Sequence, residues 1–130
     1  MKKILTIISC VILLAASSCT KQYVTPNPNE TLYATVNTTD WALYSDGKSY
    51  SASVNAPDLN SDFAKFGGVI VAISYADDVY EQLPEVYNGT SFSYTYNQGN
   101  LTLYAQSADG LTPIKPTQAI KVKIILVASN

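Results

Sequence analysis

Short turn dipeptides divide this sequence into segments of strand length, and their spacing constrains the fold more than any other feature. The segments between them are rich in Val, Ile, Thr and Tyr, the residues that fit a pleated surface best. The pattern therefore predicts an all-β domain built largely from hairpins. The six glycines all fall within pairs that favour a turn: Asp46-Gly47, Gly67-Gly68, Asn88-Gly89, Gln98-Gly99 and Asp109-Gly110.

Two hairpins can be tested for register by placing a two-residue loop at the turn dipeptide. A half-buried antiparallel sheet requires that each hairpin sorts into an apolar and a polar side. With Asp46-Gly47 as the loop, the apolar side is Trp41, Leu43, Tyr50, Ala52 and Val54, and the polar side is Ala42, Tyr44, Ser49, Ser51 and Ser53. With Gln98-Gly99 as the loop, the apolar side is Phe92, Tyr94, Tyr96, Leu101, Leu103 and Ala105, opposite Ser91, Ser93, Thr95, Thr102 and Tyr104.

The remaining segments complete the predicted domain. Residues 68–75 are apolar on both sides and predict a central strand, and residues 79–83 predict a short one. Residues 61–66 are compatible with a single helical turn. In 119–127 the apolar residues face inward, and Lys121 and Lys123 on the outer side are expected to guard a strand edge. The predicted fold is an antiparallel two-sheet β-sandwich, immunoglobulin-like in general shape, with seven or eight strands.

The N-terminus carries the pattern of an export signal. Lys2 and Lys3 precede a mostly apolar run over residues 4–16, shorter than the roughly 20 residues that span a bilayer. Small residues follow and lead to Cys19. The segment Leu14-Ala15-Ala16-Ser17-Ser18-Cys19 resembles the lipobox of bacterial lipoproteins, although Ala16 stands where Leu is commonest. The alternative is an ordinary secretory signal with a chance cysteine.

The lipobox resemblance implies a domain plan and a location. Residues 1–18 would be the lipoprotein signal peptide, and Cys19 would become the mature N-terminus, carrying acyl chains that hold stably in a membrane. Thr20 rather than Asp follows the cysteine, which in lipoprotein sorting favours the outer membrane, on an undetermined face. Residues 19–31, rich in Pro and Asn, predict a flexible tether, and residues 32–130 the β-sandwich.

Composition excludes several classes of function. Removing 18 of the 130 residues leaves 112, enough for one domain, with six lysines against ten acidic residues and a net charge of about −4. The absence of arginine and of a basic patch argues against nucleic-acid binding. Without histidine, a Ser-His-Asp triad is impossible, and one remaining cysteine cannot form a disulfide or a Cys/His zinc site.

Two kinds of acidic chemistry remain open by composition. A pair of carboxylates of the glycosidase kind is not excluded, but most acidic residues sit beside turns, where Asp is favoured for local hydrogen bonding. Calcium takes six to eight oxygen ligands, and Asp77-Asp78 with Glu81, or Asp58 with Asp62, could begin such a site. A solvated acidic loop is the simpler interpretation, so we predict no catalytic residues, no metal site and no cofactor.

Aromatic residues raise the possibility of sugar binding. Trp41, Tyr50, Tyr94 and Tyr96 fall on the predicted core side. Tyr44 and Tyr104 fall on the polar side of their hairpins and form the candidate ligand surface, with Tyr80 and Tyr87 near loops. Exposed tyrosines on a Ser/Thr-rich sheet suit a glycan platform, and they equally suit an ordinary sheet surface.

Several short segments together resemble a family of small bacterial β-sandwich lipoproteins with no assigned function. The resemblance implies a fold and no site residues. We therefore expect a non-catalytic, lipid-anchored envelope protein with a structural or interaction role, whose partner is an envelope protein or a glycan. The alternative is a small glycan- or ligand-binding module. The matching segments are Trp41, Ala56-Pro57-Asp58-Leu59, Gly67-Gly68-Val69, Leu83-Pro84, Tyr94-Thr95-Tyr96, Leu111-Thr112-Pro113-Ile114 and the strand over 121–127.

Overall fold

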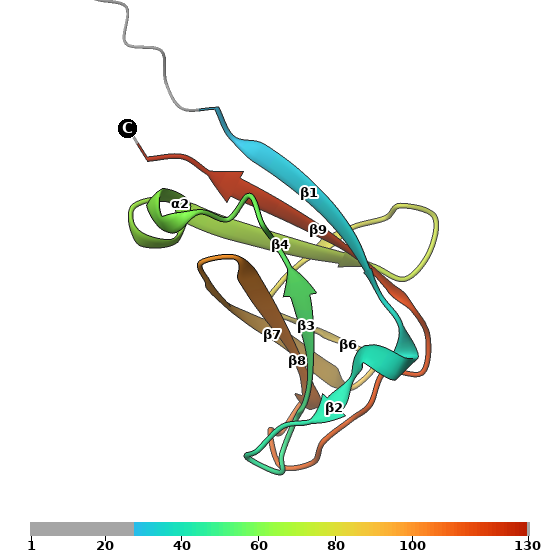
Figure 1. Ribbon diagram of the computed structural model, residues 1–130. Helices are drawn as coiled ribbons and strands as arrows, with labels where there is room; N and C mark the ends of the chain where they lie inside the picture. Colours follow the sequence, from blue (N-terminus) through green and yellow to red (C-terminus); the bar gives the residue numbers. More distant parts are fainter. Residues whose placement is uncertain (1–27, 130) are drawn as a thin grey trace, which may run out of the picture.

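The computed structural model describes residues 28–129, which form two antiparallel sheets packed as a sandwich (Figure 1). The four-stranded sheet has the order β1-β9-β4-β5, and the five-stranded sheet has the order β2-β3-β8-β7-β6. Nine strands are therefore present in the described residues, against the seven or eight expected. Their bounds are β1 Glu30–Val36, β2 Ala42–Leu43, β3 Tyr50–Asn55, β4 Gly68–Ser74, β5 Glu81–Gln82, β6 Glu85–Tyr87, β7 Thr90–Asn97, β8 Asn100–Ser107 and β9 Ile120–Val127.

Both predicted hairpin registers are confirmed. Leu43 pairs with Tyr50 across the β2–β3 hairpin, and Tyr96 pairs with Leu101 across the β7–β8 hairpin. The sheets then bury the predicted apolar sides against each other. Buried residues from both sheets form one hydrophobic cluster, which includes Trp41, Val54, Phe92, Leu103, Ile73, Val122 and Ile124.

Three side chains depart from the predicted faces. Leu43 and Tyr96 are 57% and 38% exposed although both lie on the apolar side. Each is close to the turn of its hairpin, where the opposite sheet no longer covers it. Ser49 was expected on the polar side but is buried, and its hydroxyl donates to the carboxylate of Asp46 at 3.1 Å. Local hydrogen bonding in the turn therefore outweighs the strand alternation there.

The strand over 120–127 is not at an edge, which corrects one expectation. β9 pairs with β1 on one side and with β4 on the other, so Lys121 and Lys123 do not guard a free edge. Their side chains lie on the outer face of the four-stranded sheet. The lysines are tolerated in mid-sheet because alternation keeps them on the solvent side while Ile120, Val122 and Ile124 are buried.

The segment around Pro84 also differs from expectation. The short strand predicted over 79–83 is reduced to β5, because Val79 and Tyr80 belong to the turn after β4. The chain then crosses between the layers at Leu83 and Pro84 and adds β6, a strand that the alternation pattern did not indicate. The helical turn at 61–66 is present as α2, Ser61–Lys65, and the Asn60 side chain caps it by accepting from the backbone N–H groups of Asp62 and Phe63.

The two ends of the described chain lie side by side. β1 begins at Glu30, two residues before the expected domain start at 32. The Asn29 side chain accepts a hydrogen bond of 3.0 Å from the backbone N–H of Ala128, just after β9. In Figure 1 both ends lie at the end of the sandwich that carries α2. The segment that precedes the domain therefore joins it at this end.

Candidate functional site

The candidate lipid acceptor Cys19 lies outside the residues that the structure describes. The other two predicted site residues are brought together. Tyr44 and Tyr104 meet edge to face, with ring centroids 5.2 Å apart and an interplanar angle of 82°. Tyr44 is 41% exposed, and the Tyr104 hydroxyl lies 3.3 Å from the hydroxyl of Thr95. The pair lies on the outer side of the five-stranded sheet, where the edge of one ring meets the face of the other.

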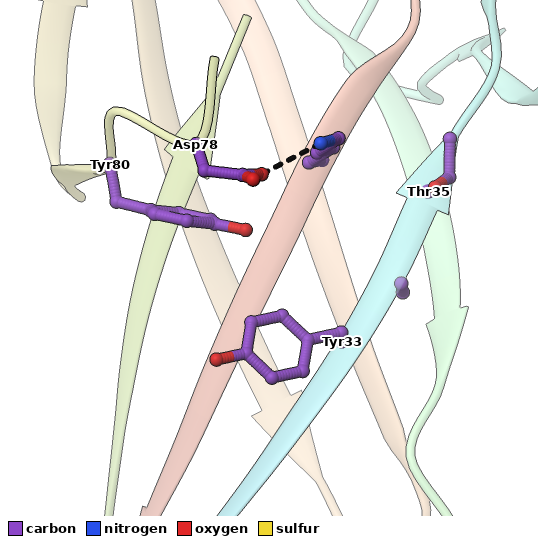
Figure 2. A pocket seen from close by; sticks show the side chains of 6 residues that line it. Tyr33, Thr35, Asp78 and Tyr80 are labelled. Carbon is purple, nitrogen blue, oxygen red and sulfur yellow. Dashed lines mark hydrogen bonds and ion pairs between the residues drawn. The ribbon is translucent and has the colours of Figure 1, made fainter. Parts of the chain in front are cut away.

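A second pair of tyrosines, Tyr33 and Tyr80, lies beside a cavity on the opposite side of the molecule. The outer face of the four-stranded sheet carries a cavity of about 630 Å³ lined by Tyr33, Ala34, Thr35, Asp78, Tyr80 and Lys121, which we call the tyrosine groove. Figure 2 shows the two tyrosine rings reaching across β9 from opposite sides, with the Asp78–Lys121 ion pair at one end. The ring centroids of Tyr33 and Tyr80 are 6.4 Å apart and inclined at 59°.

Strand register explains how the groove is built. Tyr33 and Thr35 alternate with the inward-facing residues of β1 and lie opposite Lys123 and Lys121 of β9. The next strand, β4, places the small residue Ala72 opposite Lys123. The large ring of Tyr33 on β1 and the small side chain of Ala72 on β4 leave room above β9. Tyr80, from the turn after β4, covers part of that room, and the ammonium of Lys123 lies 5.3 Å from its ring centroid.

The turn that carries Asp78 is conformationally strained. Asp77 and Asp78 have φ values of 56° and 55°, in the left-handed region that costs energy for residues other than glycine. This turn directs the Asp78 carboxylate back over the sheet, where it accepts a hydrogen bond of 2.7 Å from the ammonium of Lys121. Strain of this kind persists only where the surrounding structure determines it.

The ion pair in the groove is accessible to solvent. The side chains of Lys121 and Asp78 are 55% and 69% exposed. The hydrogen bond that Lys121 donates to Asp78, together with the negative charge of Asp78, raises the pKa of Lys121, so the lysine is fully charged at neutral pH. An exposed pair of this kind contributes little to stability, because solvent screens the two charges. The groove thus presents an ammonium and a carboxylate that matter little to folding.

A second aromatic cluster is formed by Tyr75, directly after β4, and Tyr87, at the end of β6. Tyr75 and Tyr87 stack with centroids 4.7 Å apart, and smaller cavities of about 220 and 290 Å³ lie beside them. Burial raises the pKa of Tyr75, and the nearby charges of Glu85 and Glu81 add to this effect. One carboxylate oxygen of Glu85 is buried without a hydrogen-bond partner. Burial is the largest cause that raises the pKa of Glu85 to about 7. A hydrogen bond with Glu81 and the negative charge of Glu81 add to this effect.

The acidic residues considered for calcium do not converge. Within residues 28–129 no three His, Cys, Asp or Glu side chains are grouped as metal ligands would be. Asp78 is paired with Lys121 instead. Asp62 lies in the first turn of α2, where the free N–H groups of a helix favour a negative charge.

Sequence reasoning missed Tyr33 and placed Tyr80 only near a loop. The signal for Tyr33 was available, because Leu32, Ala34 and Val36 alternate with it and leave it on the solvent side of a strand. Alternation along one strand does not predict which side chain of another strand lies beside Tyr33. Tyr33 meets Tyr80 only because β1 pairs with β9 and β9 pairs with β4, contacts between segments far apart in the chain.

Comparison with known proteins gives no relative from which a function could be carried over. No family model, no curated protein and no solved structure matches this chain. Among the described residues, no helix is long and apolar enough to cross a membrane.

Proposed function

We propose that this chain is a non-catalytic, lipid-anchored protein of the bacterial cell envelope that acts by binding, through the tyrosine groove, to a component of that envelope or of a neighbouring surface. The anchor is the acylated Cys19, held in the outer membrane. The lipobox-like segment before Cys19 supports the anchor, and the shape and composition of the groove support the binding role.

The observation that carries the binding role is the exposure of Tyr33. Its side chain is 66% exposed on β1, an edge strand of the four-stranded sheet, beside a cavity, with the ring of Tyr80 inclined toward it. Ligand sites combine aromatic or apolar walls with a few placed polar groups, and the groove has both. The strained Asp77-Asp78 turn that positions one of those polar groups adds to this argument.

The position of the groove on the domain fits an anchored binder. The domain begins at Glu30. Thr35 lies five residues further along β1, about 17 Å from that point, and Lys121 lies opposite it on β9. Thr35 and Lys121 of the groove therefore lie toward the end of the sheet away from Glu30.

The same proposal includes two finer assignments of the fold. One is an immunoglobulin-like general shape, supported by two packed antiparallel sheets. The other is membership of the family of small β-sandwich lipoproteins that the sequence resembles. Neither assignment supplies site residues, so the binding role does not depend on them.

A glycan-binding module centred on Tyr44 and Tyr104 is the second candidate. The observation in its favour is that the two rings lie together on a sheet face rich in Ser and Thr. This pair is less accessible than the groove, because Tyr44 is 41% exposed whereas Tyr33 is 66% exposed. Tyr44→Ala is therefore the natural control for variants of Tyr33.

The anchor and the binding role are tested separately. Cys19→Ala should leave an unprocessed precursor that takes up no labelled palmitate, and normal maturation of this variant would contradict the lipobox. For binding, the full-length chain is held on beads in detergent and mixed with washed envelope fragments from cells that lack it. Tyr33→Ala should lose the bound fragments and Tyr44→Ala should keep them. Equal retention by wild type and Tyr33→Ala would refute the groove as the binding surface.

A further inference from the structure

The polar groups of the tyrosine groove are already neutral as a set. The two charged side chains that line it, Lys121 and Asp78, neutralise each other at 2.7 Å. A strongly charged ligand would have to separate the Lys121–Asp78 pair or leave one member without its partner. A purely apolar ligand would cover the ion pair without hydrogen-bonding to it, which carries a desolvation cost.

The polar groups that line the groove can hydrogen-bond to the hydroxyls of a neutral ligand. The ammonium of Lys121 offers donors, the carboxylate of Asp78 offers acceptors, and the hydroxyl of Thr35 offers both. Thr35 lies directly opposite Lys121 in the register of β1 and β9, so these three groups gather at one end of the groove. Adjacent hydroxyls on a sugar ring can accept from an ammonium and donate to a neighbouring carboxylate at the same time.

The aromatic groups lie beside these polar groups in the same cavity, with Tyr80 next to Asp78 and Tyr33 further along the groove (Figure 2). Tyr33 and Tyr80 present ring surface beside the polar end rather than around it (Figure 2). A pyranose ring has the same division, because its axial C–H groups form an apolar face while its hydroxyls project around the rim. The cavity of about 630 Å³ also lies within the usual size range of small-ligand sites.

From this match we infer that the tyrosine groove binds a neutral oligosaccharide, with a sugar ring against Tyr33 and neighbouring hydroxyls bound by Lys121 and Asp78. The inference rests on the proposed function, since it names the ligand class of the same surface. It differs from the second candidate above in the site, because Tyr44 and Tyr104 lie on the other sheet. Tyr80 and Thr35 complete the contact surface.

The test uses the full-length chain in detergent and soluble neutral polysaccharides: a glucan, a mannan, a xylan and a galactan. Affinity electrophoresis in gels that contain each polymer measures retardation, and calorimetric titration with oligosaccharides of the retarding polymer measures affinity. Tyr33→Ala should weaken binding by about tenfold, while Tyr33→Phe should retain it, because the ring rather than the hydroxyl makes the contact. Asp78→Asn should also weaken binding by about tenfold, through loss of the charged acceptor.

Matched controls keep the result interpretable. The Lys121–Asp78 pair is exposed, so Asp78→Asn should fold, and a thermal melt near that of wild type checks this. Tyr44→Ala removes a tyrosine from the opposite outer face and should leave the affinity unchanged. Saccharide binding that is sensitive to Tyr44→Ala but not to Tyr33→Ala would overturn the inference.

The two remaining outcomes separate this inference from the proposed function. If no neutral polymer retards the chain, while Tyr33→Ala still abolishes binding to envelope fragments, the ligand class is wrong and the groove stays the binding surface. If no polymer retards the chain and Tyr33→Ala also leaves the binding to envelope fragments unchanged, both proposals are refuted.

Discussion

The hydroxyl of Tyr94 on β7 donates a hydrogen bond of 2.6 Å to the backbone carbonyl of Val69 on β4. The two strands belong to different sheets, so the bond joins the layers of the sandwich directly. Its acceptor is a backbone group at the start of a strand that forms part of the core, and the ring of Tyr94 packs against that core. The contact explains why a tyrosine, rather than phenylalanine, suits this partly buried position.

Removal of this hydroxyl gives the first prediction. Tyr94→Phe should lower the free energy of unfolding by about 1 kcal/mol, because the Val69 carbonyl loses its donor while the packing of the ring is kept. Tyr96→Phe on the same strand is the matched control, since Tyr96 is more exposed and should change stability by less than about 0.5 kcal/mol. Urea denaturation measures both, and equal effects would show that the inter-sheet bond does not contribute.

Truncation of the single tryptophan tests the position of the core. Trp41 is 3% exposed and packs edge to face with Phe92, with ring centroids 6.5 Å apart. Trp41→Ala should cost about 3–5 kcal/mol. Leu43→Ala, on the same side of the β2–β3 hairpin but 57% exposed, should cost less than about 1 kcal/mol. A small effect for Trp41→Ala would mean that this end of the core is poorly packed.

The adjacent glycines Gly67 and Gly68 should respond differently to the same substitution. A Cβ at Gly67 would collide with the backbone carbonyl oxygen of Val127 and press against Phe63, whereas a Cβ at Gly68 would meet nothing within 4 Å. Gly67→Ala should therefore destabilise the domain by about 1–3 kcal/mol, since backbone cannot move aside cheaply. Gly68→Ala should be nearly neutral. Thermal melting of the two variants checks the contrast, and similar melting temperatures would contradict the close approach of α2 and β9.

Glu85 should make stability depend on pH. Its pKa is raised to about 7 from an ordinary value of 4.5, so between these values the folded protein holds a proton that the unfolded chain has lost. The free energy of unfolding should therefore fall as pH rises from 4.5 to 7, by less than about 1 kcal/mol because the residue is only partly buried. Glu85→Gln should flatten this dependence and stabilise the domain above pH 7.

The neighbouring carboxylate provides a second variant for the same measurement. Glu81→Gln keeps Glu85 but removes the negative charge that helps to raise its pKa, so the fall in stability should become smaller without disappearing. Unfolding in urea at a series of pH values measures both variants. An unchanged pH dependence in Glu85→Gln would show that another group is responsible.

The sequence was enough to predict local structure where the signal is repeated along the chain. The registers of the β2–β3 and β7–β8 hairpins followed from a turn dipeptide and a period of two, because a slip by one residue would bury the serines and expose the leucines. The same rule failed for Leu43 and Ser49. These residues lie at a hairpin end, where hydrogen bonds to Asp46 and the limit of the opposite sheet decide burial instead.

By itself, the sequence determined an all-β domain, two hairpin registers, the inward faces of the long strands and the resemblance of the segment before Cys19 to a lipobox. Only the tertiary structure decided which strands are neighbours, and hence the tyrosine groove. β1 begins the domain and β9 ends it, yet they pair along their whole length, and this pairing brings Tyr33 to Lys121, Asp78 and Tyr80. Alternation fixes the face on which a side chain lies, because it is a local property of the backbone. The neighbour across the sheet depends on which distant strands bury their apolar faces together, and no local pattern encodes that choice.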